Sequence, residues 1–244
     1  MRIVGSEAYW GEVQKRLVEH GFDPGPIDGA RGDMTDGALI RFKASRNLRP
    51  RAYIGPATEE ALMAEPDATL GDEPHWLTVA RRYLGLREVP GARDHPQIVS
   101  WWSDINAGWF DDDETPWCGA FVGGVLAEAG LPVLVSDGAR ARAWEDWGQG
   151  LDVPAVGAIV TFFRGGLEAG SGHVAFVVGR SRAGRVACLG GNQDDAVTIA
   201  EYDERRASSW GVTSYRWPEN HPLPENQGME ALPVMSVTSG GRVT

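Results

Sequence analysis

Apolar residues recur every three to four positions through the first half of the chain, a spacing that predicts amphipathic helices. Stripes of this kind cover residues 10–22, 35–42 and 56–62, and glycine- and proline-rich turns lie between them. The pattern predicts a small bundle of three short helices within residues 1–66. Further helices are predicted near residues 76–84, 98–105, 116–129 and 139–147.

After Pro154 the pattern changes to short runs rich in β-branched and aromatic residues, which are typical of strands. The runs cover residues 157–164, 172–180, 185–190, 196–202 and 212–217. Helices followed by strands predict an α+β domain with an antiparallel sheet over residues 75–218. We expect the acidic, proline-bounded residues 67–74 to be a linker and residues 219–244 to be a flexible or surface-draped tail.

The predicted helix at 116–129 holds a candidate nucleophile. Pro116 can start this helix, so Cys118 falls in its first turn, where free N–H groups and the helix dipole favour a thiolate. The helix also contains three glycines, Gly119, Gly123 and Gly124. Because glycine weakens a helix, they indicate a close approach, which we expect to be against the sheet. A buried cysteine that only fills space is the alternative.

Two predicted strands carry side chains that could assist the thiol. If residues 181–184 form a four-residue hairpin loop, Arg180 pairs with Arg185, and His173 then faces Asn192 on one face of the sheet. Asn192 could hydrogen-bond the imidazole ring. A bulge would shift the count by one and turn Asn192 away. A cysteine, a histidine and an amide that converge are the parts of a nucleophilic site.

Composition narrows the possible partners. The net charge of −11 and the pI near 4.9 argue against binding to nucleic acid or to an anionic membrane. Cys118 and Cys188 are too few for a disulfide framework or a cysteine zinc site. The first residues show no signal peptide and no long apolar run follows, so we expect a soluble chain made in the cytoplasm.

Two further features have open interpretations. The acidic run at residues 111–114 could bind a cation or a substrate amine, or be a solvated loop. Ten tryptophans are many for this length, and Trp117 and Trp109 could wall a substrate groove or pack in the core.

Residues 13–17, the run 21–29, Thr35 with Phe42, and residues 55–62 keep the order and spacing of a known module. They resemble the three-helix peptidoglycan-binding domain of many wall hydrolases. Lys43 departs from the pattern, since the family usually has glutamine there. A packing or dimerisation module without a ligand is the alternative.

Residues 117–122, 157–162, 172–177 and 190–193 together resemble the papain-like cysteine amidohydrolases of bacterial walls, the NlpC and CHAP groups. The likeness covers residues 75–218 and implies a papain-like domain, with helices packed on an antiparallel sheet. It implies that Cys118 is the nucleophile and His173 the base. The family's variable third residue maps to Asn192, with Gln193 as the fallback. The resemblance requires no metal and no cofactor.

Both resemblances point to peptidoglycan, so the sequence predicts a monomeric hydrolase that cuts an amide in or next to the stem peptide. With no signal peptide, the chain looks like a phage endolysin that reaches the wall through a separate holin-like protein; a secreted effector also fits. Alternatives are a non-enzymatic wall-binding or virion structural protein, and acyl transfer to another amine. A zinc amidase is disfavoured because no His-Glu-x-x-His spacing is present.

Overall fold

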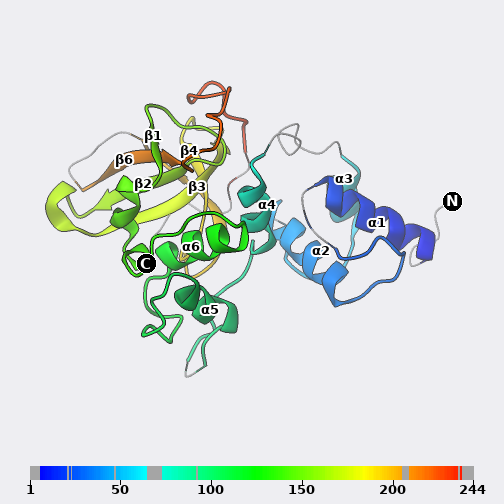
Figure 1. Cartoon of the computed structure of the whole chain (residues 1–244). Coiled ribbons are helices and arrows are strands. Elements are labelled where there is room, and N and C mark those ends of the chain that lie inside the picture. Colours follow the sequence, from blue (N-terminus) through cyan, green and yellow to red (C-terminus); the bar gives the residue numbers. More distant parts are fainter. Residues whose placement is uncertain are drawn as a thin grey trace.

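The computed structural model describes residues 6–20, 22, 24–46, 48–64, 73–91, 93–204, 209–235 and 237. Its N-terminal part contains the three predicted helices, α1 (Glu7–Glu19), α2 (Asp33–Ser45) and α3 (Pro56–Met63) (Figure 1). Their apolar stripes meet in a buried core formed by Val13, Leu17, Leu39, Phe42 and Leu62. Most of the expected linker, residues 67–72, lies outside the described residues.

Gln14 of α1 is buried and holds the loop between α1 and α2. Its amide nitrogen donates to Asp28 Oδ1 (3.1 Å) and to the carbonyl of Ala30 (2.9 Å), and its oxygen accepts from the N–H of Gly29 (2.8 Å). Gly29 has a φ of 74°, and a Cβ there would lie 2.5 Å from a carbonyl oxygen of α1. The turn-rich run is therefore anchored by the helix before it.

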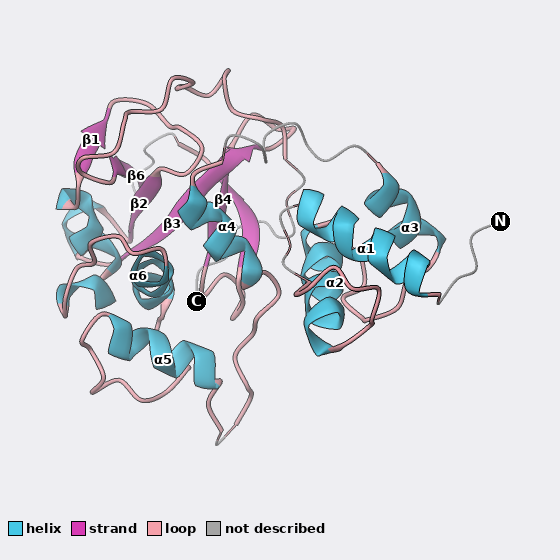
Figure 2. Ribbon diagram, turned by 45° about the vertical axis from the view of Figure 1, so that its right-hand side comes forward, coloured by secondary structure: helices cyan, strands magenta, loops and turns pink. Residues whose placement is uncertain are grey.

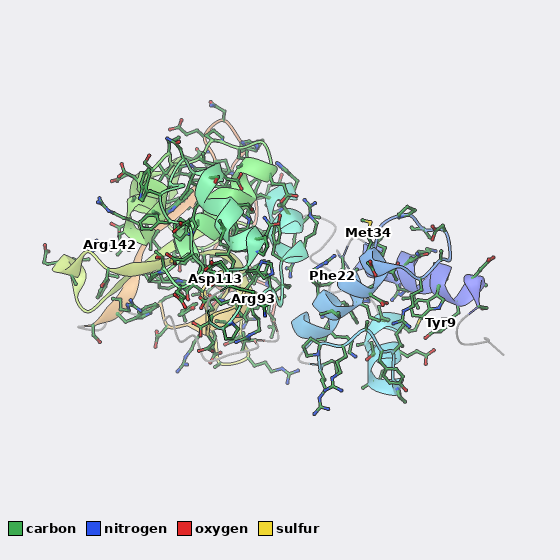
Figure 3. The ribbon with its side chains drawn as sticks, turned by 90° about the horizontal axis from the view of Figure 1, so that it is seen from below. Tyr9, Phe22, Met34, Arg93, Asp113 and Arg142 are labelled. Carbon is green, nitrogen blue, oxygen red and sulfur yellow. The ribbon has the colours of Figure 1, made fainter. Side chains whose placement is uncertain are left out.

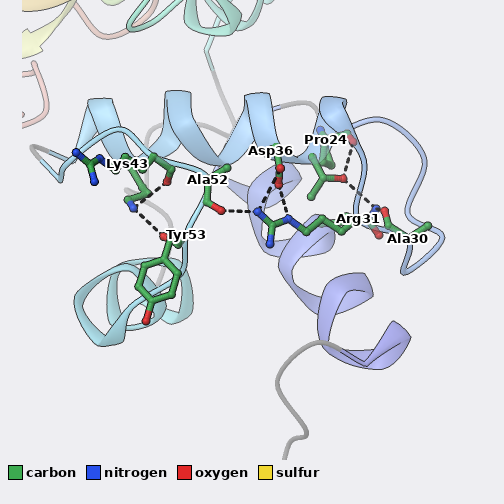
Figure 4. Close-up of polar contacts among 10 residues, drawn as sticks. Pro24, Ala30, Arg31, Asp36, Lys43, Ala52 and Tyr53 are labelled. Carbon is green, nitrogen blue, oxygen red and sulfur yellow. Dashed lines mark hydrogen bonds and ion pairs between the residues drawn. The ribbon is translucent and has the colours of Figure 1, made fainter.

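Lys43, the departure from the three-helix pattern, points into the bundle. Its ammonium group donates to the carbonyls of Arg51 (2.9 Å) and Tyr53 (2.7 Å), as Figure 4 shows. Arg31 holds the same loop, since it pairs with Asp36 and donates to a carbonyl of the loop. Lys43 is therefore a structural residue that closes the loop after α2.

The C-terminal part confirms the predicted α+β class (Figures 1 and 2). Its helices are α4 (His75–Arg82), α5 (Pro96–Asp104) and α6 (Cys118–Glu128). Its strands are β1 (Gln149–Leu151), β2 (Ile159–Arg164), β3 (Gly172–Arg180), β4 (Val186–Gly190), β5 (Thr198–Tyr202) and β6 (Trp210–Trp217). They form one antiparallel sheet in the order β1-β6-β2-β3-β4-β5. The helix predicted at 139–147 is two short 3₁₀ turns, η1 (Asp137–Ala139) and η2 (Ala141–Asp146).

The two faces of the sheet are covered differently. α6 packs on one face, where the ring of Phe121 lies 6.2 Å from that of Phe176. On the other face the rings of Phe162 in β2 and Tyr202 in β5 lie 4.8 Å apart. A flat sheet would place these strands about 14 Å apart, because β3 and β4 lie between them. The sheet therefore curls around the ring cluster.

The register of β3 and β4 is partly as expected. Val177 pairs with Cys188, but a bulge between Val177 and Gly179 makes Arg180 pair with Val186. The expected pairing of Arg180 with residue 185 is therefore wrong. A Cβ at Gly179 would lie 2.5 Å from a carbonyl oxygen of the C-terminal segment, so the bulge makes room for that segment.

Part of the expected tail packs on the sheet domain. Arg180 donates to the carbonyl of Pro233 (2.8 Å) and accepts from the N–H of Met235 (2.7 Å). The N–H of Gly228 donates to the carbonyl of Pro154 (2.7 Å), and the side chain of Leu232 is buried. Residues 228–235 thus pack on the surface of the sheet domain.

The glycines of α6 do permit close packing, but their neighbours are not in the sheet. A Cβ at Gly124 would lie 2.0 Å from Trp101 of α5, and Gly123 is equally close to the end of α5. A Cβ at Gly119 would lie 2.1 Å from the carbonyl oxygen of Gly138 in η1. The expectation of a contact with the sheet is wrong. The glycines therefore allow α5 and η1 to pack closely against α6, which itself packs on the sheet.

This packing predicts that Gly124→Ala destabilises the C-terminal part by about 2 kcal/mol, because the strain of the added methyl outweighs the gain in helix propensity. Urea unfolding followed by tryptophan fluorescence measures the change. Gly108→Ala is the control, since its nearest neighbour is 3.5 Å away. An unchanged midpoint for Gly124→Ala would contradict the close packing.

Candidate active site

Cys118 lies at the start of α6, as the sequence predicts, and its side chain is 4% exposed. The turn before the helix is closed by Asp112, whose carboxylate accepts from the N–H groups of Glu114 (3.0 Å) and Thr115 (2.5 Å). Trp117 is the N-cap residue, and the N–H of Phe121 donates to its carbonyl. The local sequence thus fixes the point at which the helix begins.

The thiol lies beside the point where β4 ends. In β3 the N–H of Val177 points toward β2, so the N–H of Val174, three residues earlier, points to the opposite side. There β4 has ended at Gly190, and the following Gly191 packs against the start of α6. The N–H of Val174 faces the sulfur of Cys118 and stabilises its negative form. Val174 follows His173 directly in β3, so the thiol lies beside the strand that carries the histidine.

A chain of hydrogen bonds fixes the ring of His173. The amide nitrogen of Gln193 donates to the carbonyl (2.7 Å) and the hydroxyl (3.0 Å) of Thr198. Because a carbonyl can only accept, this contact sets the orientation of the amide and turns Oε1 toward the ring. Oε1 accepts from the hydroxyl of Tyr202 (2.9 Å) and from Nε2 of His173 (3.1 Å). Nε2 therefore carries the proton.

The opposite ring nitrogen has a different environment. Nδ1 of His173 is buried and has no hydrogen-bond partner among the residues that the structure describes. Since Nε2 carries the proton of the neutral ring, Nδ1 presents a lone pair. A buried acceptor without a partner costs stability, so it is a feature to be explained by function.

Burial dominates the electrostatics of the site. It raises the pKa of the Cys118 thiol, and the N–H groups of Val174 and Gly119 offset this only in part. Burial also lowers the pKa of His173 to about 4, although the hydrogen bond with Gln193 raises it. Both groups are therefore neutral at pH 7. The expectation of a thiolate is wrong for the resting site, because desolvation outweighs the helix start.

The other predicted site residues are placed as follows. Asn192 is buried and has a φ of 52°, a left-handed conformation that asparagine tolerates, and Gln193 makes the contact with Nε2. Trp117 is fully buried and donates to Glu88 Oε1 (2.7 Å), so its ring packs in the core. Trp109 is 63% exposed and stays a candidate for substrate contact.

The acidic run is a solvated loop only in part, since Asp111 and Glu114 are exposed and Asp112 is half-buried. Asp113 is fully buried, and its Oδ2 accepts from the N–H groups of Val89 (2.9 Å) and His95 (2.8 Å). Figure 3 shows Asp113 among the side chains of the C-terminal part, far from Phe22 in the bundle. Over the described ranges no group of three or more His, Cys, Asp or Glu side chains is arranged to hold a metal ion. Asp113 ties two loops together beside the site.

Thr198 and Tyr202 are site residues that the sequence analysis missed. They lie four apart in β5, so they share a face of the strand, and both contact Gln193. A spacing of four positions is common in half-buried strands, so it did not mark these two residues as part of a site. The signal available in the sequence was two polar side chains on the same face of the strand predicted at 196–202.

Family models match both parts of the chain. Residues 110–192 match the CHAP domain, and residues 6–62 match the "Putative peptidoglycan binding domain". A comparison with curated proteins finds no match, and neither does one with solved structures. None of the described helices is long and apolar enough to cross a membrane. The chain therefore joins an N-terminal peptidoglycan-binding domain to a CHAP domain, and this combination supports a CHAP-type peptidoglycan hydrolase.

Proposed function

We propose that this hydrolase cleaves an amide bond in or next to the stem peptide of peptidoglycan, with Cys118 as nucleophile and His173 as general base. The observation that carries the proposal is the lone pair on Nδ1 of His173, which Gln193 keeps free of a proton by bonding Nε2. Gln193, rather than Asn192, is then the residue that orients the ring. General bases of this kind need the correct tautomer.

The neutral state of both groups defines the order of proton transfers. The thiol of Cys118 gives its proton to Nδ1 as its sulfur attacks the amide carbonyl. A thiolate–imidazolium ion pair therefore does not have to form before the substrate binds. The imidazolium then gives that proton to the leaving amine, and a thioester with Cys118 remains. Water loses a proton to Nδ1 and attacks the thioester, which frees the new carboxyl group and restores the thiol. The N–H of Cys118 at the helix start is one donor for the oxyanion.

The finer biological role is also a proposal. The pairing of a wall-binding domain with a hydrolase domain supports an endolysin that acts on the cell wall after a separate holin-like protein gives it access. Under this proposal, protein made inside cells lyses them only after their inner membrane has been permeabilised, and it cuts purified wall without any helper. Failure on purified wall would contradict it.

Mass spectrometry of muropeptides tests the reaction itself. The wild type is expected to release fragments that carry one new amine and one new carboxyl group, with the mass of one added water. Acyl transfer would add the mass of an amine instead. Digests with Cys118→Ser supply the blank, and Cys188→Ala, at the other buried cysteine, should act as the wild type does. If the wild type releases no new termini, the chain is a wall-binding protein without this activity.

A further inference from the structure

The second half of α2 and the loop between α2 and α3 concentrate positive charge. Residues 37–58 contain no acidic side chain and five basic ones, Arg41, Lys43, Arg46, Arg49 and Arg51. The chain as a whole has a net charge of −11. The side chains of Arg49 and Arg51 are exposed. A basic surface on an acidic chain favours the binding of an anionic group at that place.

The backbone of this loop is fixed by hydrogen bonds. Lys43 and Arg31 together bond the carbonyl groups of residues 51–53. Two further bonds close turns within the loop, from the N–H of Arg51 to the carbonyl of Arg49 (2.9 Å) and from the N–H of Tyr53 to the carbonyl of Arg51 (2.7 Å). A loop that is fixed before binding loses less entropy when a ligand binds to it.

The fixed loop presents the ring of Tyr53 to solvent. This side chain is 70% exposed, and Figure 4 shows its ring pointing away from α2. A Cβ at Gly55 would lie 3.2 Å from a ring carbon, so the ring lies beside the backbone at the start of α3. A tyrosine ring offers a broad apolar face and a polar tip, and few rotatable bonds are immobilised when it contacts a ligand.

Electrostatics in the loop favour an anionic ligand. Burial lowers the pKa of Lys43, and the charge of Arg51 lowers this pKa further. The two cations therefore repel each other. Lys43 is buried and Arg51 is exposed, so an anion that approaches from solvent can pair with Arg51 and offset this repulsion.

We propose that Arg49, Arg51 and Tyr53 form the surface with which the N-terminal domain binds peptidoglycan, and that this surface recognises a stem-peptide carboxylate beside a sugar ring. Arginine binds carboxylates with two parallel N–H groups, and the ring of Tyr53 can stack on the apolar face of a sugar. The matched family is named for peptidoglycan, whose anionic groups are the carboxylates of its peptides. The inference rests on the wall-binding role of this domain and does not require cleavage.

The test measures sedimentation of the full chain carrying Cys118→Ala with purified peptidoglycan freed of other wall polymers, before and after amidation of its carboxylates. This chain is expected to bind the untreated material about 10-fold more tightly than the amidated material. Adding Arg49→Gln with Arg51→Gln should make binding to both materials equally weak. Tyr53→Ala should weaken binding to both by about 3- to 10-fold, and Tyr53→Phe should keep most of it.

Arg182→Gln is the matched control, because it removes an exposed charge from the loop between β3 and β4 and should leave binding unchanged. The urea midpoint of each variant checks that it folds. Equal binding to untreated and amidated peptidoglycan, or full binding by the double arginine variant, would overturn the assignment. Loss of binding once the other wall polymers are removed would also overturn it, because the anion would then be a phosphate of those polymers.

The same measurements separate this inference from the proposed reaction. If the wild type cleaves nothing but the arginine and tyrosine variants lose binding as described, the reaction fails and the binding surface stands. If the wild type cleaves peptidoglycan and these variants bind as tightly as their parent, only the assignment of the surface fails.

Discussion

Replacing His173 with alanine (His173→Ala) is expected to lower kcat/KM on purified peptidoglycan by about 10³-fold or more. The thiol of Cys118 is held neutral by burial, and without Nδ1 it loses the proton acceptor that the proposed mechanism assigns to it. The release of new amino groups measures the rate. Binding to sedimented wall should be unchanged, because His173 lies in β3, outside the residues that match the peptidoglycan-binding domain.

The same assay decides which amide orients the ring. Gln193→Ala should lower kcat/KM by roughly 10- to 100-fold, because Nε2 loses its acceptor and the ring can adopt the other tautomer. The matched comparison is Asn192→Gly, which removes the neighbouring amide and still permits the positive φ at that position. A larger loss for Asn192→Gly than for Gln193→Ala would restore Asn192 as the orienting residue. Full activity of His173→Ala would end the proposed mechanism.

Glutamine suits position 193 for a reason that lies in β5. The side-chain nitrogen faces the carbonyl of Thr198, which needs a donor, while the oxygen faces two donors. A carboxylate would put an acceptor against that carbonyl. The site therefore requires a group that donates at one end and accepts at the other, which an amide provides.

The start of α6 could be predicted from sequence because its signals are local. Pro116 and the stop after residue 129 set the helix, and Cys118 follows from them. The strands could be predicted for the same reason, since alternation and turn residues lie within a few positions of one another. Structure that is determined by residues a few positions apart can be predicted from the sequence.

The choice between Asn192 and Gln193 could not be made from sequence. It depends on where β4 ends and how the chain turns after Gly190, and both follow from contacts with the start of α6. The bulge at Gly179 depends likewise on a segment more than fifty residues later. Register errors of one residue reverse a side chain's direction, so distant packing decides which amide meets the ring.

The protonation states were equally out of reach, because burial is a property of the whole fold. A helix start favours a thiolate, and the sequence shows that effect alone. The opposing effect is the burial of the sulfur, which arises only when the folded chain closes over it. A neutral thiol and a neutral imidazole therefore replace the expected ion pair. Protonation of the buried imidazole in acid is then expected to destabilise the folded protein.

We expect the CHAP domain to lose roughly 3 kcal/mol of stability between pH 6.5 and pH 4 through His173 alone. Burial lowers the pKa of His173 to about 4 in the folded protein, whereas the unfolded chain takes up this proton near the ordinary value of 6.5. In this window the unfolded state binds more protons, so stability falls as the pH falls. Above pH 6.5 both states are neutral at this residue, and the contribution is fully present.

Urea unfolding at a series of pH values measures this loss, and His173→Gln is the matched variant because it keeps a side chain of similar size that does not titrate. Nine of the ten tryptophans follow residue 75, so their fluorescence reports on the CHAP domain. The free energy of unfolding of the variant should fall less steeply than that of the wild type from pH 6.5 to pH 4. For the comparison, each curve is expressed relative to its own value at pH 7.5. Parallel curves would mean that the pKa of His173 is the same in the folded and the unfolded protein, and this would contradict the lowering of that pKa by burial.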